Sequence, residues 1–279
     1  MRARRQLVFC FLAGLSLAGC VIQRPVNWPA VSDRRPETES VQALITESPA
    51  PATIKEEIDV PIIIYHHIKD DYNSNSEADK NYTVTVANFR AQLDYLVERG
   101  FAPILISDIA RYFAGDFKWP DKPIVITFDD GLISQYQSAW PILRERGFKA
   151  TFFIFTNPIG KNDNYFNWEQ INELAEAGSE IGSHGHYHLF WDKITDQELR
   201  QEIIASKEMI EAKIGRPVIA AAYPFGQSSD QATQALKDAG YLVARDIVNG
   251  RSHQSAELFK LKAYFVTNDF SRFKTIVGD

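Results

Sequence analysis

Two short stretches combine residue types that metal-dependent hydrolysis requires. Residues 124–128 are apolar enough for a buried strand, yet Asp129, Asp130 and Gly131 follow directly. Two adjacent carboxylates at the end of a buried strand would repel each other, and a divalent cation would offset that repulsion. Gly131 allows a sharp backbone turn, so that both carboxylates can reach one pocket. Taken alone, Asp-Asp-Gly is more typical of a turn with an Asp cap.

The second stretch is the histidine-rich segment 184–188. The spacing of His184 and His188 brings two imidazoles to the same side of a helical turn, as metal binding requires. His186 would point elsewhere, and we expect it at the rim or in contact with substrate. These histidines alone could be a solvated loop cluster, but a carboxylate from a neighbouring strand end favours a metal site.

A site of two histidines and one carboxylate with an open position suits Zn²⁺, although Co²⁺ or Ni²⁺ would also fit. Such a cation lowers the pKa of a bound water toward ~7. A second carboxylate beside that water can then act as a general base.

The elements that must position these residues alternate between strand and helix. Strand composition is found at 61–65, 101–106, 124–128, 150–155, 180–183, 218–223 and 241–244. Helical patterns with capping residues or terminal glycines are found at 87–99, 134–146, 167–177, 195 to about 215, and 229–239. This alternation predicts parallel strands with right-handed crossovers, in an open doubly wound sheet or a barrel.

Polar or turn-forming residues follow the predicted strands repeatedly. They include Asp129 and Asp130, His184, the segment 223–226, and the pair His66 and His67. In both candidate folds the carboxyl ends of the strands carry the chemistry, so these groups are expected to meet. A phosphate-handling or sugar-isomerising metal barrel would need a basic cluster at these ends, and we find none.

The ordered motifs resemble those of the polysaccharide deacetylases, the family-4 carbohydrate esterases with the NodB homology domain. The matching stretches are T-F-D-D-G at 127–131, H-x-x-x-H at 184–188 and A-Y-P-F-G at 222–226. The resemblance implies a distorted (β/α)7 barrel. It also implies that Asp129 is the general base and that Asp130, His184 and His188 are the metal ligands.

The chain departs from this family pattern at several positions. Gly185 stands where the second motif usually has Ser or Thr. Ala221 and Ala222 stand before Tyr223, where the third motif usually begins with an arginine that pairs with the base. Another group must therefore orient Asp129. A late leucine-histidine motif that supplies the general acid is also missing.

The first predicted strand offers a substitute for the missing histidine. Its sequence, I-I-I-Y-H-H-I, resembles the start of the deacetylases that act on exported poly-β-1,6-N-acetylglucosamine, where this strand contributes the catalytic histidine. We assign the general acid to His66, with His67 as the fallback. We assign oxyanion stabilisation to the metal and the backbone N–H of Tyr223. Together with Tyr223, the residues Pro224, Phe225 and Gly226 form the expected substrate and oxyanion segment.

The expected reaction is metal-dependent removal of acetyl groups from an N-acetylglucosamine polysaccharide. Poly-β-1,6-N-acetyl-D-glucosamine of a biofilm matrix is the favoured substrate, and peptidoglycan or a chitooligosaccharide is the alternative. A catalytically inactive carbohydrate-binding lipoprotein is a second reading, because the motif arginine and late histidine are missing. Trp168 and Tyr187 are candidates for stacking on sugar rings, and His253 is expected at the surface.

The N-terminus has the layout of a secretory signal. Arg2, Arg4 and Arg5 precede an apolar run at 7–17, and L-A-G-C at 17–20 resembles the lipobox of bacterial lipoproteins. We predict a signal peptide at 1–19 and an acylated Cys20 that anchors the protein to a membrane. An ordinary signal peptide is the alternative. Because an aspartate does not follow the cysteine, the periplasmic face of the outer membrane is favoured.

Composition sets the domain organisation. Residues 20–59 are rich in Pro, Ser, Thr and Glu and are predicted to be a flexible linker. Residues 60–279 are predicted to form one deacetylase domain. The formal net charge of −6 gives no sign of the basic surface that binds nucleic acid.

Overall fold

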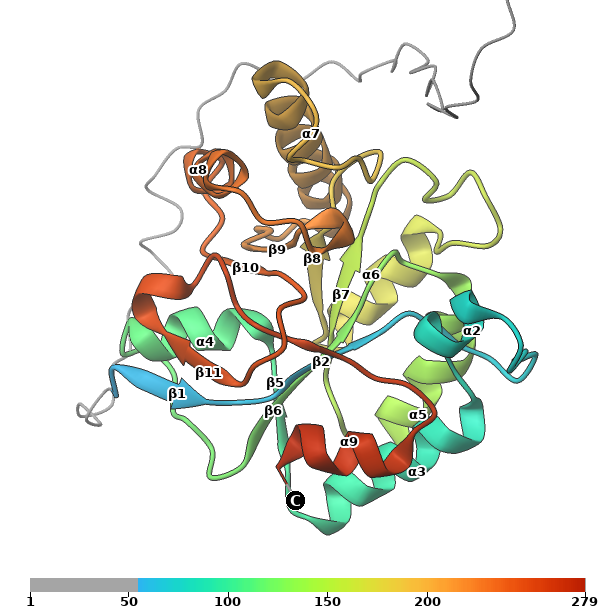
Figure 1. The fold of residues 1–279 in the computed structure, drawn as a ribbon. Helices are drawn as coiled ribbons and strands as arrows, with labels where there is room; N and C mark the ends of the chain where they lie inside the picture. The colour runs from blue at the N-terminus through green and yellow to red at the C-terminus, as the bar shows by residue number, and fades with distance from the viewer. Residues whose placement is uncertain (1–54, 279) are drawn as a thin grey trace, which may run out of the picture.

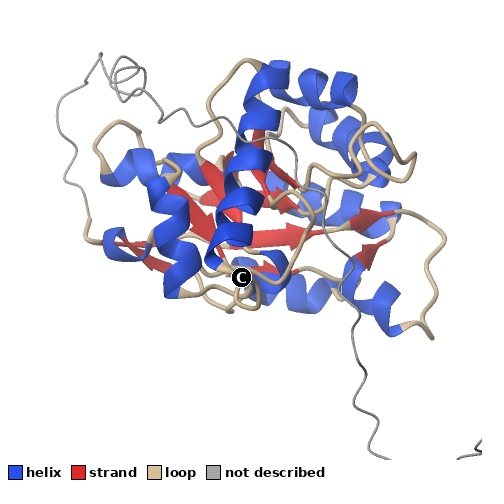
Figure 2. Cartoon of the chain, turned by 90° about the horizontal axis from the view of Figure 1, so that it is seen from above, coloured by secondary structure: helices blue, strands red, loops and turns tan. Residues whose placement is uncertain are grey.

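A parallel β-sheet surrounded by helices forms the centre of the molecule (Figures 1 and 2). The computed structural model describes residues 55–278, so the predicted signal peptide, the lipidation site Cys20 and most of the predicted linker lie outside the described residues. The strand order is β10-β9-β8-β7-β6-β2-β12, and β5 also pairs with β6. The predicted alternation of strands and helices is therefore confirmed.

Most of the predicted elements lie close to their expected bounds, but the predicted strand 101–106 ends at Ile104 and α4 begins at Ile106. The sheet strands are β2 (Ile62–Tyr65), β5 (Ala102–Ile104), β6 (Pro123–Phe128), β7 (Thr151–Ile154), β8 (Glu180–Ser183), β9 (Ala220–Ala222), β10 (Val243–Arg245) and β12 (Tyr264–Phe265). The helices are α2 (Glu77–Tyr82), α3 (Val86–Glu98), α4 (Ile106–Phe113), α5 (Trp140–Glu145), α6 (Trp168–Glu176), α7 (Asp196–Ile214), α8 (Asp230–Asp238) and α9 (Phe270–Val277). Two small pairs complete the described strands: β1 (Glu57–Asp59) with β11 (Ser252–Gln254), and β3 (His67–Ile68) with β4 (Thr83–Val84).

Strand β6 lies at the middle of the sheet. One edge pairs with β2 along its length, while β5 and β7 share the other edge: β5 pairs with residues 123–125 and β7 with 127–128. All of these pairs are parallel. The carboxyl end of β6, where the two aspartates follow, is therefore enclosed between β2 and β7.

Both faces of the central strands are buried, which explains why they read as continuous apolar runs. Ile63 of β2 packs in one hydrophobic cluster with Phe128 and Phe152, whereas Ile62 and Ile64 pack in a second cluster. The rings of Phe128 and Phe152 stack at 4.9 Å between centroids. Alternate side chains of one strand thus stabilise opposite faces of the sheet.

The predicted helix 134–146 contains a local irregularity. Residues Gln135–Ala139 form a π-helical turn before α5 begins at Trp140. Pro141 has no backbone N–H, so it cannot donate the usual bond to the carbonyl four residues earlier. The wider turn places the side chain of Gln135 under the candidate site, where its amide donates to the backbone carbonyls of His66 and Asp129.

The smaller elements have no counterpart among the elements predicted from sequence. Strand β1 lies in the last residues of the predicted linker and pairs with β11, and α2, α4 and α9 were not foreseen.

The expectation that His253 lies at the surface is wrong. It is 1% exposed, because β11 turns its ring inward to bond the carbonyl oxygen of Val60 at 3.0 Å. Within residues 55–278, every helix is too short or too polar to cross a membrane.

Candidate active site

The carboxyl ends of β2, β6, β8 and β9 open into one cavity of about 510 Å³. Most of the predicted site residues line it: His66, His67, Asp129, Asp130, His184, His188, Tyr223, Phe225 and Gly226. Pro224 is buried behind this surface, and neither Trp168 nor Tyr187 lines the cavity.

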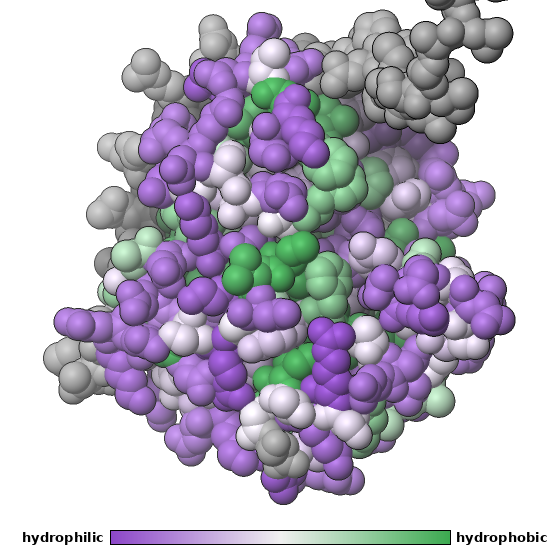
Figure 3. Space-filling model, in the orientation of Figure 1, coloured by the Kyte–Doolittle hydropathy of each residue, from purple (hydrophilic) through white to green (hydrophobic). Residues whose placement is uncertain are grey.

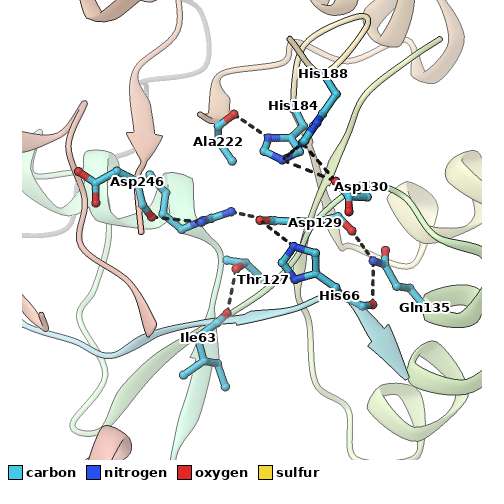
Figure 4. A network of polar contacts seen from close by, with 11 residues as sticks. Ile63, His66, Thr127, Asp129, Asp130, Gln135, His184, His188, Ala222 and Asp246 are labelled. Carbon is cyan, nitrogen blue, oxygen red and sulfur yellow. Dashed lines mark hydrogen bonds and ion pairs between the residues drawn. The ribbon is translucent and has the colours of Figure 1, made fainter. Parts of the chain in front are cut away.

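The side chains of Asp130, His184 and His188 converge on one point (Figure 4). The two Nε2 atoms are 3.2 Å apart, and Oδ1 of Asp130 lies 3.7 Å from Nε2 of His184 and 3.5 Å from that of His188. Tetrahedral ligands at zinc-like bond lengths of ~2.0–2.1 Å are ~3.3 Å apart. The predicted ligand set therefore fits a divalent cation.

Hydrogen bonding and burial prepare the histidines for this role. Nδ1–H of His184 donates to the carbonyl oxygen of Ala222 at 2.8 Å, which leaves Nε2 as the free ligand atom. Burial lowers the pKa of His184 to about 4 and that of His188 to about 3. Both rings are therefore neutral at pH 7, as ligands must be. His186 is different: it is buried against Thr156, with Nδ1 2.7 Å from Oγ1, so its predicted place at the rim is wrong.

The two aspartates have different environments although they are adjacent. Asp130 has a φ of 75° and Gly131 one of 70°, so the chain turns sharply and the two carboxylates separate. Burial alone would raise the pKa of Asp129, but Arg245, His184 and His66 outweigh it and hold that pKa below its ordinary value. Burial, followed by the charge of Asp129, raises the pKa of Asp130 to about 7. Asp129 is therefore ionised without a cation, whereas Asp130 is the carboxylate that a cation would stabilise.

Arg245 is the functional residue that the sequence analysis missed. It is fully buried on β10, and Nη2 lies 2.5 Å from Oδ1 of Asp129. In the parallel ladder it pairs with Ala222, the position where the family motif usually has its arginine. The guanidinium thus reaches Asp129, the predicted base, from the neighbouring strand. The sequence feature that could have revealed it is the arginine that directly follows the apolar predicted strand 241–244.

His66 and His67 differ in their distance from the base. Nε2 of His66 is 4.0 Å from Oδ2 of Asp129, and its ring stacks on Phe265 at 5.5 Å. Nδ1 of His67 instead lies 3.4 Å from Oγ of Ser134. Burial lowers the pKa of His66 to about 4 although the charge of Asp129 acts in the opposite direction. His66 is therefore neutral at pH 7 before substrate binds.

The backbone of the segment 223–226 corrects one assignment. The N–H of Tyr223 donates to the carbonyl oxygen of Arg245 at 3.1 Å, so it is already used by the sheet and the predicted oxyanion role for this N–H is wrong. Gly226 N–H donates to the carbonyl oxygen of Tyr223 at 2.8 Å, and Pro224 has no N–H. Phe225 therefore has the one N–H of this segment that neither bond uses, and its φ of 58° marks a tight turn at the cavity.

Comparison with known proteins agrees with this geometry. Residues 118–244 match the family model described as polysaccharide deacetylase. The chain is 28% identical over 265 residues to the protein named "Putative polysaccharide deacetylase YxkH" of Bacillus subtilis (strain 168), covering 92% of each chain. Residues 118–244 therefore form a polysaccharide deacetylase domain. The chain is thus a hydrolase that acts on carbon–nitrogen bonds other than peptide bonds.

Two further comparisons place this deacetylase among its relatives. It is 26% identical over 237 residues to the poly-beta-1,6-N-acetyl-D-glucosamine N-deacetylase of Staphylococcus epidermidis, covering 77% of this chain and 81% of that protein. Its fold matches the deacetylase PplD of Streptococcus pyogenes, solved in complex with acetate, with a TM-score of 0.71 and 23% identity over 76% of this chain and 94% of that chain. The predicted distorted (β/α)7 barrel is confirmed.

Aromatic rings flank the candidate metal site of the deacetylase. Phe190 and Phe225 stack at 3.7 Å between centroids although both are partly exposed, and Phe225 contacts His188 at 4.5 Å. Tyr82 and Phe265 line the cavity beside His66. Figure 3, in the orientation of Figure 1, shows a largely hydrophilic surface with hydrophobic side chains gathered near the middle of the face that is drawn. Tyr82, Phe225 and Phe265 line the cavity, whereas Trp168 and Tyr187 do not, and stacking of the latter two on sugar rings stays a prediction.

Gly131 is required by both its conformation and its surroundings. Its φ is +70°, and an added Cβ would lie 2.9 Å from Cγ2 of Ile154. Gly100 has a similar φ of +72° but no atom within 4 Å of an added Cβ, which makes Gly100→Ala a matched control. We expect Gly131→Ala to lower the free energy of unfolding by ~1–3 kcal/mol more than Gly100→Ala does, as measured by denaturant titration. Equal losses would show that the contact with Ile154 is unimportant.

Proposed function

We propose that this deacetylase is a metal-dependent N-deacetylase of poly-β-1,6-N-acetyl-D-glucosamine. The convergence of Asp130, His184 and His188 beside an ionised Asp129 is the observation that carries the proposal. The histidine pair at the end of β2 and the likeness to the Staphylococcus epidermidis enzyme support the choice of polymer. A Zn²⁺ ion fits the donor set best, and Co²⁺ or Ni²⁺ would also fit.

Different groups of the chain have separate roles in the proposed reaction. When bound, the cation activates a water molecule and polarises the acetyl carbonyl. Asp129 accepts a proton from the attacking water, and the N–H of Phe225 donates to the oxyanion. A new C–O bond forms, the C–N bond breaks, and acetate leaves while the sugar nitrogen becomes a free amine.

His66 is the group proposed to protonate that amine. Its ring lies 4.0 Å from the carboxylate that takes the water proton, close enough for transfer through a small shift or one water. Because His66 is neutral in the free protein, it must gain its proton within the reaction cycle rather than bring one to it. His67, bonded to Ser134, is less well placed.

A catalytically inactive carbohydrate-binding protein is less well supported. That reading rested on the missing motif arginine and the missing late histidine. Arg245 supplies a guanidinium to Asp129, and His66 lies beside the same carboxylate. Both missing groups thus have replacements from other strands.

The proposal extends to location. The sequence resemblance to lipoproteins supports acylation at Cys20, anchoring at the periplasmic face of the outer membrane, and action on a biofilm polysaccharide during export. Mass spectrometry of the mature N-terminus tests the acylation directly.

Removing the metal tests the proposed function. Acetate release would be measured on β-1,6-linked N-acetylglucosamine pentamers after dialysis against dipicolinate and after addition of Zn²⁺, Co²⁺ or Ni²⁺. We expect activity to disappear on chelation and to return with metal. The β-1,4-linked pentamer and peptidoglycan are the matched substrates, and faster reaction on either would reassign the polymer. Release that survives complete chelation would contradict the metal-dependent mechanism.

A further inference from the structure

A buried carboxylate that the reaction does not use lies behind the metal-binding loop. Glu202, on α7, is 0% exposed. Its Oε1 accepts the backbone N–H of Tyr187 at 2.6 Å, and its Oε2 accepts Nε1–H of Trp191 at 3.3 Å. Burial raises the pKa of Glu202, whereas the nearby backbone N–H groups of His186 and Leu189 act to lower it. Every one of these partners is a donor, so the carboxylate serves as a common acceptor for the loop.

The loop that Glu202 holds begins directly after His184 and carries the second histidine of the candidate site, His188. His188 has a φ of 59°, a left-handed conformation that is unfavourable for a residue with a side chain. On one side of it the N–H of Tyr187 donates to Glu202, and on the other side the N–H of Leu189 is near enough to lower the pKa of Glu202. The carboxylate thus fixes the backbone around the strained residue whose Nε2 must lie 3.2 Å from that of His184. Without the carboxylate, the part-buried N–H of Tyr187 would lose a charged acceptor, which is costly.

Glu202 also explains why a glycine follows the first histidine ligand. Gly185 has a φ of +84°, and an added Cβ would lie 2.6 Å from Oε2 of Glu202 and 3.3 Å from Trp191. A serine or threonine, which the family motif usually has here, would collide with the carboxylate. The glycine at position 185 therefore leaves the space that the buried carboxylate of Glu202 occupies.

We propose that Glu202 is a positioning residue that holds the loop 185–191 in its metal-binding conformation, so that metal affinity depends on it. The proposal rests on the metal site of the proposed function. Glu202 lies outside the cavity and does not reach the cation itself. It acts through His188, whose ring can approach His184 and Asp130 only while the loop keeps this shape.

The affinity of the full chain for Zn²⁺, measured by competition with a chromogenic chelator, tests the proposal. We expect Glu202→Gln to weaken Zn²⁺ binding by ~10- to 100-fold, because an amide cannot accept all of these donors. Glu180→Gln is the matched control. Glu180 lies at the other end of β8, where its carboxylate accepts from Thr151 at 3.0 Å and from the backbone of Ser107 at 3.3 Å. That variant is expected to lose stability but to bind Zn²⁺ within ~2-fold of the wild type.

A second variant keeps the test decisive if Glu202→Gln does not fold. Trp191→Phe removes one donor to the carboxylate and keeps most of the buried ring, and we expect ~2- to 10-fold weaker Zn²⁺ binding. The positioning role would be overturned if folded Glu202→Gln bound Zn²⁺ as tightly as the wild type. If Glu202→Gln does not fold, the same result for folded Trp191→Phe would overturn it. If the wild-type chain itself bound no Zn²⁺, the metal-dependent function would fail instead, so the two failures are distinguishable.

Discussion

Asp129→Asn is expected to reduce kcat for acetate release by ~10²- to 10⁴-fold, the usual contribution of a general base. Asparagine has nearly the same shape as aspartate but cannot accept a proton from water. Asp129 is 3% exposed and forms an ion pair with Arg245. The substitution therefore removes the negative charge but leaves the shape and the solvent exposure of the side chain nearly unchanged. The affinity for Zn²⁺ should stay within ~2-fold of the wild type, because the ligand atoms belong to other residues.

Asp130→Asn is the matched control for this experiment. The two aspartates are adjacent in sequence and both lie at the carboxyl end of β6, yet only Asp130 belongs to the convergent ligand set. Asp130→Asn should therefore lose activity together with Zn²⁺ binding, whereas Asp129→Asn should lose activity alone. If Asp129→Asn kept more than about a tenth of the wild-type rate, the base would have to be sought elsewhere.

The convergence of Asp130, His184 and His188 could be predicted from sequence because local rules place these residues. Asp130 follows a strand that is buried on both faces, and His184 follows another strand of the same parallel sheet. The carboxyl ends of parallel strands meet at one edge, so residues distant in sequence can be brought together by topology alone. The spacing of His184 and His188 then adds the second imidazole at the same point.

Contacts that depend on strand order could not be predicted in this way. Arg245 and Asp129 are separated by 116 residues, and their ion pair exists because β10 lies next to β9 at the edge of the curled sheet. The π-helical turn that brings Gln135 beneath Asp129 and His66 also depends on tertiary packing. The two remaining wrong predictions concern groups whose hydrogen bonds depend on the tertiary structure. The N–H of Tyr223 is used by the sheet, and the ring of His186 is used by Thr156.

Arg245→Ala is expected to move the acid limb of the pH profile of kcat/KM upward by about two pH units or more. Removing one partner of a buried ion pair costs ~3–5 kcal/mol, and a pKa change of one unit corresponds to ~1.4 kcal/mol. Arg245 is the largest influence that lowers the pKa of Asp129, and without it burial raises that pKa. The base would then be protonated over more of the acidic range, and activity should recover as the pH rises. Arg245→Lys keeps a cation and should show a smaller change.

The same ion pair has a defined effect on stability. Because the pKa of Asp129 is lowered in the folded protein, its contribution is fully present above the unfolded value of ~3.9 and is lost as the pH falls through the folded value. Arg245→Ala should therefore lower the free energy of unfolding at pH 7 by ~3–5 kcal/mol and by less at lower pH. Denaturant titrations at several pH values measure this difference. A loss that is independent of pH would indicate a packing role for Arg245 instead.

Moving the arginine to the neighbouring strand separates charge from packing. Ala222 pairs with Arg245 in the parallel ladder, so the two side chains lie on the same face of the sheet. Combining Arg245→Ala with Ala222→Arg keeps the total side-chain composition and returns a guanidinium to the position where the family motif usually has it. If the guanidinium orients the base, this exchange should shift the acid limb back toward the wild-type pH relative to Arg245→Ala alone. A folded exchange variant whose profile stays with that of Arg245→Ala would show that the strand of origin, and not only the charge, determines how the base is held.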